Sequence, residues 1–93
     1  MSASGAVAAG SWNLVRTNVT AITLTLPASP TNGDLPIYFK DADYNAATNN
    51  ITVDPGGSNA IENGANGETL VCTTNGAGWS VQFLNGKWRV FGA

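Results

Sequence analysis

Apolar and polar residues alternate most clearly in residues 22–26, where one isoleucine and two leucines are separated by threonines. A period of two places the apolar side chains on one face of a strand and the hydroxyls on the other. Pro27 ends this run by removing a backbone donor, and residues 29–34 have the composition of a turn. The pattern predicts a half-buried strand and a reversal of the chain toward a second β-prone run at residues 37–39.

The last third of the chain carries three more runs of this kind, at residues 69–74, 79–84 and 87–91. Asn85-Gly86 separates the last two, and this pair is the strongest short-range signal of a hairpin because both residues tolerate positive φ. The hairpin should place its apolar residues on shared faces, with Trp79, Val81 and Phe83 together in one arm, and Trp88 and Val90 opposite Lys87, Arg89 and Phe91 in the other.

Shorter signals fill the rest of the chain. Residues 12–16 predict a strand with Trp12 and Leu14 on one face, residues 51–53 predict another, and Ile61 stands alone between turns as a single anchor. Residues 1–11 are small and polar, which favours a flexible N-terminal lead-in to a single all-β domain at 12–93. No ten-residue stretch has a helical apolar stripe. We therefore predict an all-β fold, a small antiparallel sandwich or a barrel-like meander.

Charge is scarce in this chain of 93 residues. Charged residues make up 11% of it, against about 25% in typical soluble domains. Self-association would explain the shortage, because protein interfaces are depleted in Lys and Glu. The net charge is −2 and the four basic residues are scattered, so nucleic acid is a poor candidate partner. No apolar run has the length of a signal-peptide core or a membrane helix, so we expect synthesis in a cytoplasm without membrane insertion.

The familiar residues of catalysis and metal binding are missing or misplaced. There is no histidine, and Cys72 is the single cysteine, which predicts a buried thiol and excludes an internal disulfide. Residues 41–52 begin like a calcium loop, but Ala46 and Thr52 stand where such a loop needs Gly and Glu. All six carboxylates lie in or beside predicted turns, where they stabilise the backbone: Asp34, Asp41, Asp43, Asp54, Glu62 and Glu68. We predict no enzyme activity, no cofactor and no metal site.

Most of residues 19–91 resemble the β-rich repeat of phage tail fibres and tailspikes. The resemblance rests on a threonine-rich strand before Leu26-Pro27, a Gly33-Asp34 turn, a strand that ends in Asp41, the Asn-Ile-Thr-Val run at 50–53, a glycine-rich turn with Ile61, and Gly86-Lys87-Trp88. It implies a non-enzymatic structural module of the virion, in a fibre, the tail or the capsid surface, that assembles in the host cytoplasm. It also implies a homotrimer that contacts other virion proteins, and it allows a role in host attachment.

Self-association also follows from the residues themselves. Val15, Tyr38, Val71 and Phe91 are apolar on the side of their strands opposite the first apolar face, and one small core covers only one face of each strand. We expect central contacts between copies at Phe83, Trp88 and Phe91. The alternative is a monomeric carbohydrate-binding module in which Trp12, Trp79 and Trp88 stack on a host-surface glycan, although their alternation with polar residues favours burial in the core or an interface.

Overall fold

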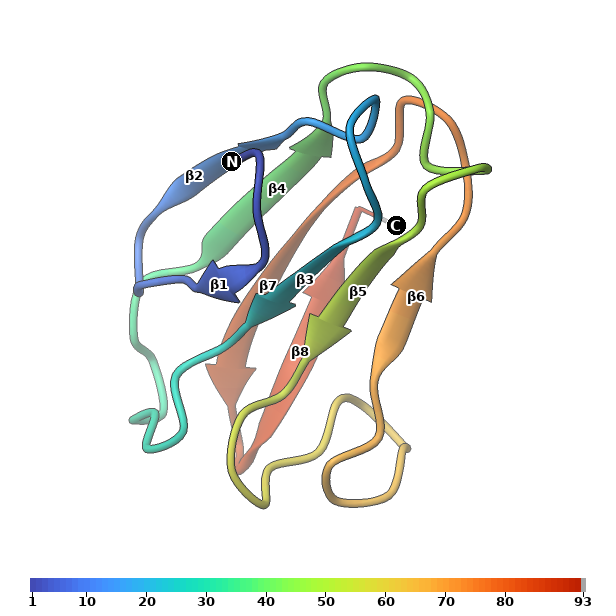
Figure 1. The fold of residues 1–93 in the computed structure, drawn as a ribbon. Helices are drawn as coiled ribbons and strands as arrows, with labels where there is room; N and C mark the ends of the chain where they lie inside the picture. Colours follow the sequence, from blue (N-terminus) through green and yellow to red (C-terminus); the bar gives the residue numbers. More distant parts are fainter. Residues whose placement is uncertain (93) are drawn as a thin grey trace.

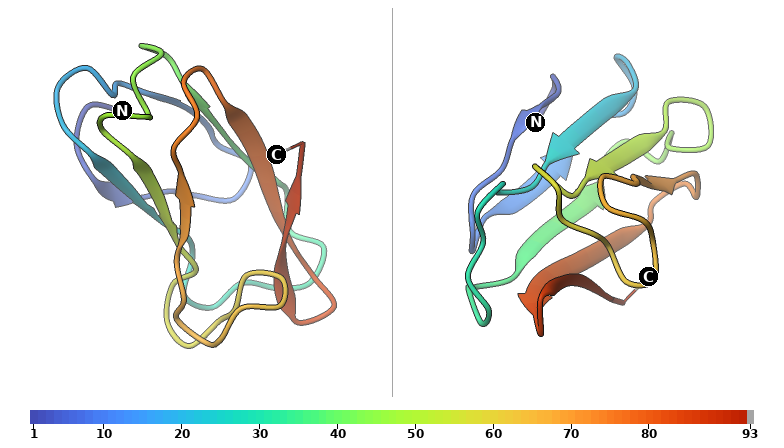
Figure 2. Two further views of the ribbon diagram at one scale, coloured as in Figure 1. Left: turned by 90° about the vertical axis from the view of Figure 1, so that its right-hand side faces the viewer. Right: turned by 90° about the horizontal axis from the view of Figure 1, so that it is seen from below.

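The computed structural model describes residues 1–92, which form two four-stranded sheets packed as a sandwich without helices (Figures 1 and 2). The all-β prediction is confirmed. One sheet has the order β1-β3-β5-β6 and the other the order β2-β4-β7-β8. The strands are β1 (Gly5–Ala6), β2 (Trp12–Val15), β3 (Ile22–Thr25), β4 (Ile37–Asp41), β5 (Ile51–Asp54), β6 (Leu70–Cys72), β7 (Gly78–Leu84) and β8 (Lys87–Phe91).

The first five strands wind back and forth between the two sheets. Strands β1, β3 and β5 lie side by side and parallel in one sheet, while β2 and β4 lie parallel in the other. Only the later strands pair antiparallel, β6 with β5, and β7 with both β4 and β8. The prediction of an antiparallel sandwich or a meander is therefore wrong, because both sheets are mixed.

The turn-rich segment between β3 and β4 explains the difference. The chain does reverse there, but residues 26–36 carry it across the sandwich instead of back along the same sheet. Two backbone bonds hold the ends of this segment, from the Leu26 N–H to the Asp54 carbonyl in one sheet and from the Gly33 N–H to the Phe83 carbonyl in the other. A connection of this length spans the roughly 10 Å between packed sheets, whereas a two-residue turn would not.

The closing hairpin of β7 and β8 has the predicted form. Asn85 and Gly86 have φ angles of 53° and 80°, which suit a type I′ turn, and Phe83 pairs with Trp88 across the two strands. Their rings meet edge to face, with centroids 5.4 Å apart. The indole N–H of Trp88 donates to the Pro55 carbonyl at 3.0 Å, so the largest buried side chain has its one donor paired.

The core fills the space between the sheets. It takes the inward residues of every strand from β2 to β8: Val15, Ile22, Leu24, Ile37, Phe39, Ile51, Val53, Cys72, Val81, Phe83 and Trp88. Leu26, Ala46 and Ile61 close it from the loops. Two expectations are confirmed here, because Cys72 is buried and Ile61 is a buried anchor that forms an isolated bridge to Trp88.

The first residues are placed against both sheets. Strand β1 pairs with β3, and the amino group of Met1 donates to the Leu14 carbonyl at 2.7 Å while the Arg16 N–H donates to the Met1 carbonyl. A strand in this segment was not expected from the sequence. The flexibility of residues 1–11, and their separation from a domain at 12–93, stay predictions.

Candidate interaction surfaces

The outer face of the β2-β4-β7-β8 sheet carries large apolar side chains. Because side chains alternate along a strand, the inward positions of Asn13, which is half-buried, and of Val15, which is buried, turn Trp12 and Leu14 outward. Trp12 is 78% exposed, Leu14 62%, and Phe91 of β8 47%. Tyr38 of β4 lies between them and is half-buried. We call the surface formed by Trp12, Leu14, Tyr38 and Phe91 the aromatic face.

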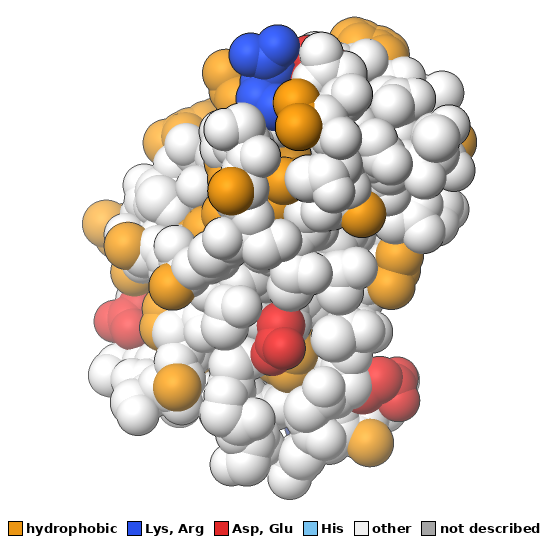
Figure 3. Space-filling model, in the orientation of Figure 1, with side chains coloured by type: hydrophobic (Ala, Val, Ile, Leu, Met, Phe, Trp, Pro, Cys, Tyr) orange, Lys and Arg blue, Asp and Glu red, His pale blue; other side chains and the backbone are white. Residues whose placement is uncertain are grey.

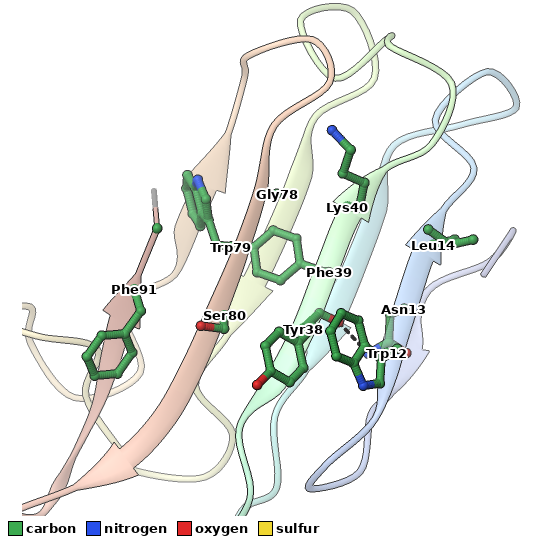
Figure 4. A pocket seen from close by; sticks show the side chains of 11 residues that line it. Trp12, Asn13, Leu14, Tyr38, Phe39, Lys40, Gly78, Trp79, Ser80 and Phe91 are labelled. Atoms are coloured by element: carbon green, nitrogen blue, oxygen red, sulfur yellow. Dashed lines mark hydrogen bonds between the residues drawn. The ribbon is translucent and has the colours of Figure 1, made fainter.

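One row of side chains crosses all four strands of this sheet. The strand register places Trp12 beside Tyr38, Tyr38 beside Ser80, and Ser80 beside Phe91. The Trp12 and Tyr38 rings stack with centroids 4.0 Å apart and planes 9° from parallel, so they form a ridge over β2 and β4 (Figure 4). Ser80 is small, so it leaves a gap between the side chains of Tyr38 and Phe91. We call this gap above Ser80 the notch.

The next row repeats the pattern. Leu14 lies beside Lys40, and Lys40 beside Gly78, which has no side chain. Together, Ser80 and Gly78 make the floor of a pocket of about 370 Å³ between the ridge and Phe91 (Figure 4). This volume is at the lower end for ligand pockets.

Two polar side chains along this pocket are already engaged within the chain. The Asn13 amide donates to the Ser11 hydroxyl and to the Tyr38 carbonyl, both at 3.0 Å. The Lys40 ammonium donates to the Gly76 carbonyl and lies 5.3 Å from the centroid of the Tyr44 ring. Among residues 1–92, Lys40 is also the only charged residue that lines the pocket, so the face suits an apolar or neutral partner.

The opposite sheet has a different outer face. Its central row contains Thr23, Thr52 and Val71, and Thr25 follows on β3. Figure 3 shows this side of the molecule with few charged groups and with apolar side chains scattered among polar ones. Within the described residues, the outer face of the β2-β4-β7-β8 sheet thus carries large aromatic side chains and the outer face of the other sheet does not.

The three residues predicted to contact other copies lie in two different places. Phe83 and Trp88 are buried in the core of the single chain, 8% and 1% exposed, so little of either side chain is available to another chain. Phe91 lies on the aromatic face, where it closes the notch. Their role between copies stays a prediction. The sequence pattern places Tyr38 as an apolar residue on the second face of its strand, and Trp12 and Leu14 on one face of theirs, but it does not join these three residues into one surface.

A second pocket of about 290 Å³, the side pocket, lies between β6, β8 and the loop that follows Ile61. Trp79, Leu70 and Val90 give it an apolar wall, and Asn63 and Glu68 lie at its rim. Within residues 1–92 the side chains of Asn63 and Glu68 make no hydrogen bonds.

Glu62 closes one end of the side pocket. Its carboxylate accepts a bond from the Val90 N–H at 3.0 Å and pairs with Arg89 at 3.3 Å. The bond from the Val90 N–H, with the help of Arg89, holds the pKa of Glu62 below its usual value. A carboxylate at this point also occupies a donor on the outer edge of β8, which protects that edge from pairing with another strand.

Most of the other acidic groups stabilise turns, as the sequence predicts. Asp34 accepts from the Thr31 N–H and Asp54 from the Gly56 N–H, each at 2.9 Å. Asp43 pairs with Arg16 at 3.0 Å, and this contact lowers its pKa. In the part of the chain that the structure describes, no three metal-ligating side chains form a cluster, and no helix is long and apolar enough to cross a membrane.

Comparison with known proteins gives no assignment. No described protein family matches the chain, and no curated protein is significantly similar to it.

Proposed function

We propose that this chain is a non-enzymatic structural module of a phage virion that self-associates as a homotrimer through its aromatic face. The observation that carries the proposal is the exposure of Trp12, Leu14 and Phe91 on one outer face of the sandwich. None of these three side chains belongs to the core between the sheets. Contiguous apolar patches on soluble proteins usually mark an interaction site, and Trp, Tyr and Phe are the residues that interfaces favour.

Two further observations support contact between copies. The whole chain is poor in charge, which suits a surface that is covered after assembly. The outer face of the other sheet is lined by threonines, so exposure of aromatic side chains is not a general property of this sandwich. The virion role and the number of three copies rest on the resemblance to tail-fibre repeats.

Light scattering on the purified chain tests the proposal. We expect about three times the 9.5 kDa chain mass, and a monomer at high micromolar concentration would refute self-association. Trp12→Ala should lower the mass, since it removes the most exposed aromatic side chain of the face. Val71→Ala is the matched control, because Val71 is 44% exposed on the other sheet and should leave the mass unchanged.

Carbohydrate binding is the second candidate, and the side pocket is the observation that favours it. An aromatic wall beside an amide and a carboxylate that make no hydrogen bond within residues 1–92, here Trp79, Asn63 and Glu68, suits a single sugar ring and would give the module a role in host attachment. A titration with monosaccharides, followed by the fluorescence of the protein and of a Glu68→Gln variant, tests this. A response that is the same in both proteins would argue against the side pocket.

A further inference from the structure

The aromatic face contains both a projecting aromatic side chain, Trp12, and a pocket lined by the aromatic side chains of Tyr38 and Phe91. We propose that the Trp12 ring of one copy inserts into the notch between Tyr38 and Phe91 of the next copy, above Ser80. This contact rests on the proposed self-association and specifies the two surfaces that meet.

The width of the notch fits one ring. Tyr38 and Phe91 extend from strands that are two positions apart in the sheet, and neighbouring strands are about 4.8 Å apart, so their backbones are separated by about 9.6 Å. A ring inserted between them needs about 3.5–4.0 Å to the carbon atoms on each side, or about 7–8 Å in all. The spacing of the strands and the pocket volume of about 370 Å³ therefore leave room for an inserted aromatic ring.

A chain cannot fill its own notch. Trp12 is on β2, the edge strand of the sheet, and the Tyr38 ring stacked against it separates it from Ser80. The ring that enters must come from another molecule. Among residues 1–92, Trp12 is the most exposed of the large hydrophobic side chains, and its place at the sheet edge allows it to reach a neighbour (Figure 4).

The polar atoms of the two surfaces also match. Within residues 1–92, neither the indole N–H of Trp12 nor the hydroxyl of Ser80 has a hydrogen-bond partner. A buried indole N–H needs an acceptor, and the Ser80 hydroxyl at the floor of the notch can supply one. Insertion would thus bury the ring without leaving its donor unpaired.

Because Trp12 of one copy meets the notch of the next, the contact is head-to-tail. Such a contact forms a ring when the rotation between copies closes. Each copy gives one Trp12 and one notch, so three copies can satisfy all of these groups in a closed trimer.

Two variants test the ridge and the notch separately. Trp12→Ala removes the inserted ring and leaves the notch intact, whereas Ser80→Trp fills the notch and leaves Trp12 intact. Ser80 points outward from a strand, where Trp is well tolerated, so the fold should persist; circular dichroism checks this. Thr52→Trp is the matched control, an outward position on a central strand of the other sheet.

Light scattering should find each variant alone as a single chain and the Thr52→Trp control at the mass of the unmodified protein. An equimolar mixture of Trp12→Ala and Ser80→Trp should give a mass of two chains, because only one of the two possible contacts can form. A Ser80→Trp protein that keeps the full mass, or a mixture that stays single chains, would overturn the insertion. If the unmodified protein is itself a single chain, the proposed self-association fails instead.

Discussion

Asp41 holds three loops to the end of one strand, and its removal should destabilise the fold strongly. It is the last residue of β4 and is fully buried. Its carboxylate accepts bonds from the Thr17 hydroxyl, from the Ala46 and Gly76 N–H groups at 2.9 Å each, and from the Asp43 N–H at 3.3 Å. These donors come from the loops after β2, β4 and β6.

Asp41→Ala would leave the Thr17 hydroxyl and the Ala46 N–H without partners, and both residues are fully buried. Each unsatisfied buried donor costs about 1–3 kcal/mol, so we expect a loss of about 2–6 kcal/mol. Domains of this kind are stable by about 5–15 kcal/mol, which makes this a large share. Urea denaturation followed by tryptophan fluorescence gives the free energy of unfolding.

Asp43→Ala is the control for this experiment. Asp43 also accepts a hydrogen bond from a loop, but its salt bridge to Arg16 is at the surface, where Arg16 is 52% exposed. Surface ion pairs contribute little, so the loss should be much smaller than at Asp41. Equal losses for the two variants, or a change at Asp41 of less than about 1 kcal/mol, would refute the view of Asp41 as the anchor of these loops.

The lowered pKa of Asp41 predicts how the stability of the fold depends on pH. Burial raises the pKa of Asp41, but the bonds from Thr17, Gly76, Ala46 and Asp43 together lower it below the ordinary value of 3.8. The native state therefore holds its proton less tightly than the unfolded state. The contribution of Asp41 to stability is complete above about pH 3.8 and is lost as pH falls through the lower native pKa. Asp41→Asn should be less stable at neutral pH and should lose less stability on acidification.

Two glycine substitutions test the backbone of the turns. Gly86→Val should destabilise the fold by about 1–3 kcal/mol because Gly86 has a φ of 80°, and an unchanged melting temperature would contradict the type I′ turn. Gly56→Ala would place a Cβ 2.2 Å from the Leu26 carbonyl oxygen, whereas Gly33→Ala, at a similar positive φ, meets nothing within 4 Å. Thermal denaturation should show Gly56→Ala to be the less stable of the two by about 1–3 kcal/mol, and equal melting temperatures would refute the close approach.

All the strands except β1 could be predicted, because their signals are local. Alternation defines residues 22–26 and 51–53, and Asn85-Gly86 fixes the last two strands as antiparallel neighbours. The pairing of the earlier strands could not be predicted, because an alternating strand has the same pattern whether its neighbour is parallel or antiparallel. Residues 26–36 are long enough to cross the sandwich as well as to return along one sheet, so only the tertiary structure decides between the two.

The aromatic face could not be predicted from the sequence for a related reason. Alternation shows which residues share a face, but not whether that face meets the core of the same chain or another molecule. Phe83 and Trp88 therefore looked as suitable for an interface as Phe91, although the structure buries the first two. For residues 12–15, two large apolar residues stand against one on the other face, yet Val15 is the one that enters the core.

The notch in particular depends on residues that the sequence connects only in part. The Asn85-Gly86 hairpin pairs Ser80 with Phe91, but only the register of the whole sheet brings Trp12 and Tyr38 into the same row. The row on the other sheet, with Thr23 and Thr52, shows that the same fold supports an outer face without aromatic side chains. Exposed rings on one face carry a risk of non-specific association that threonines avoid. Trp12 and Tyr38 form the ridge, whereas the small residues Ser80 and Gly78 form the floor of the pocket beside it. This arrangement favours one specific contact over non-specific association.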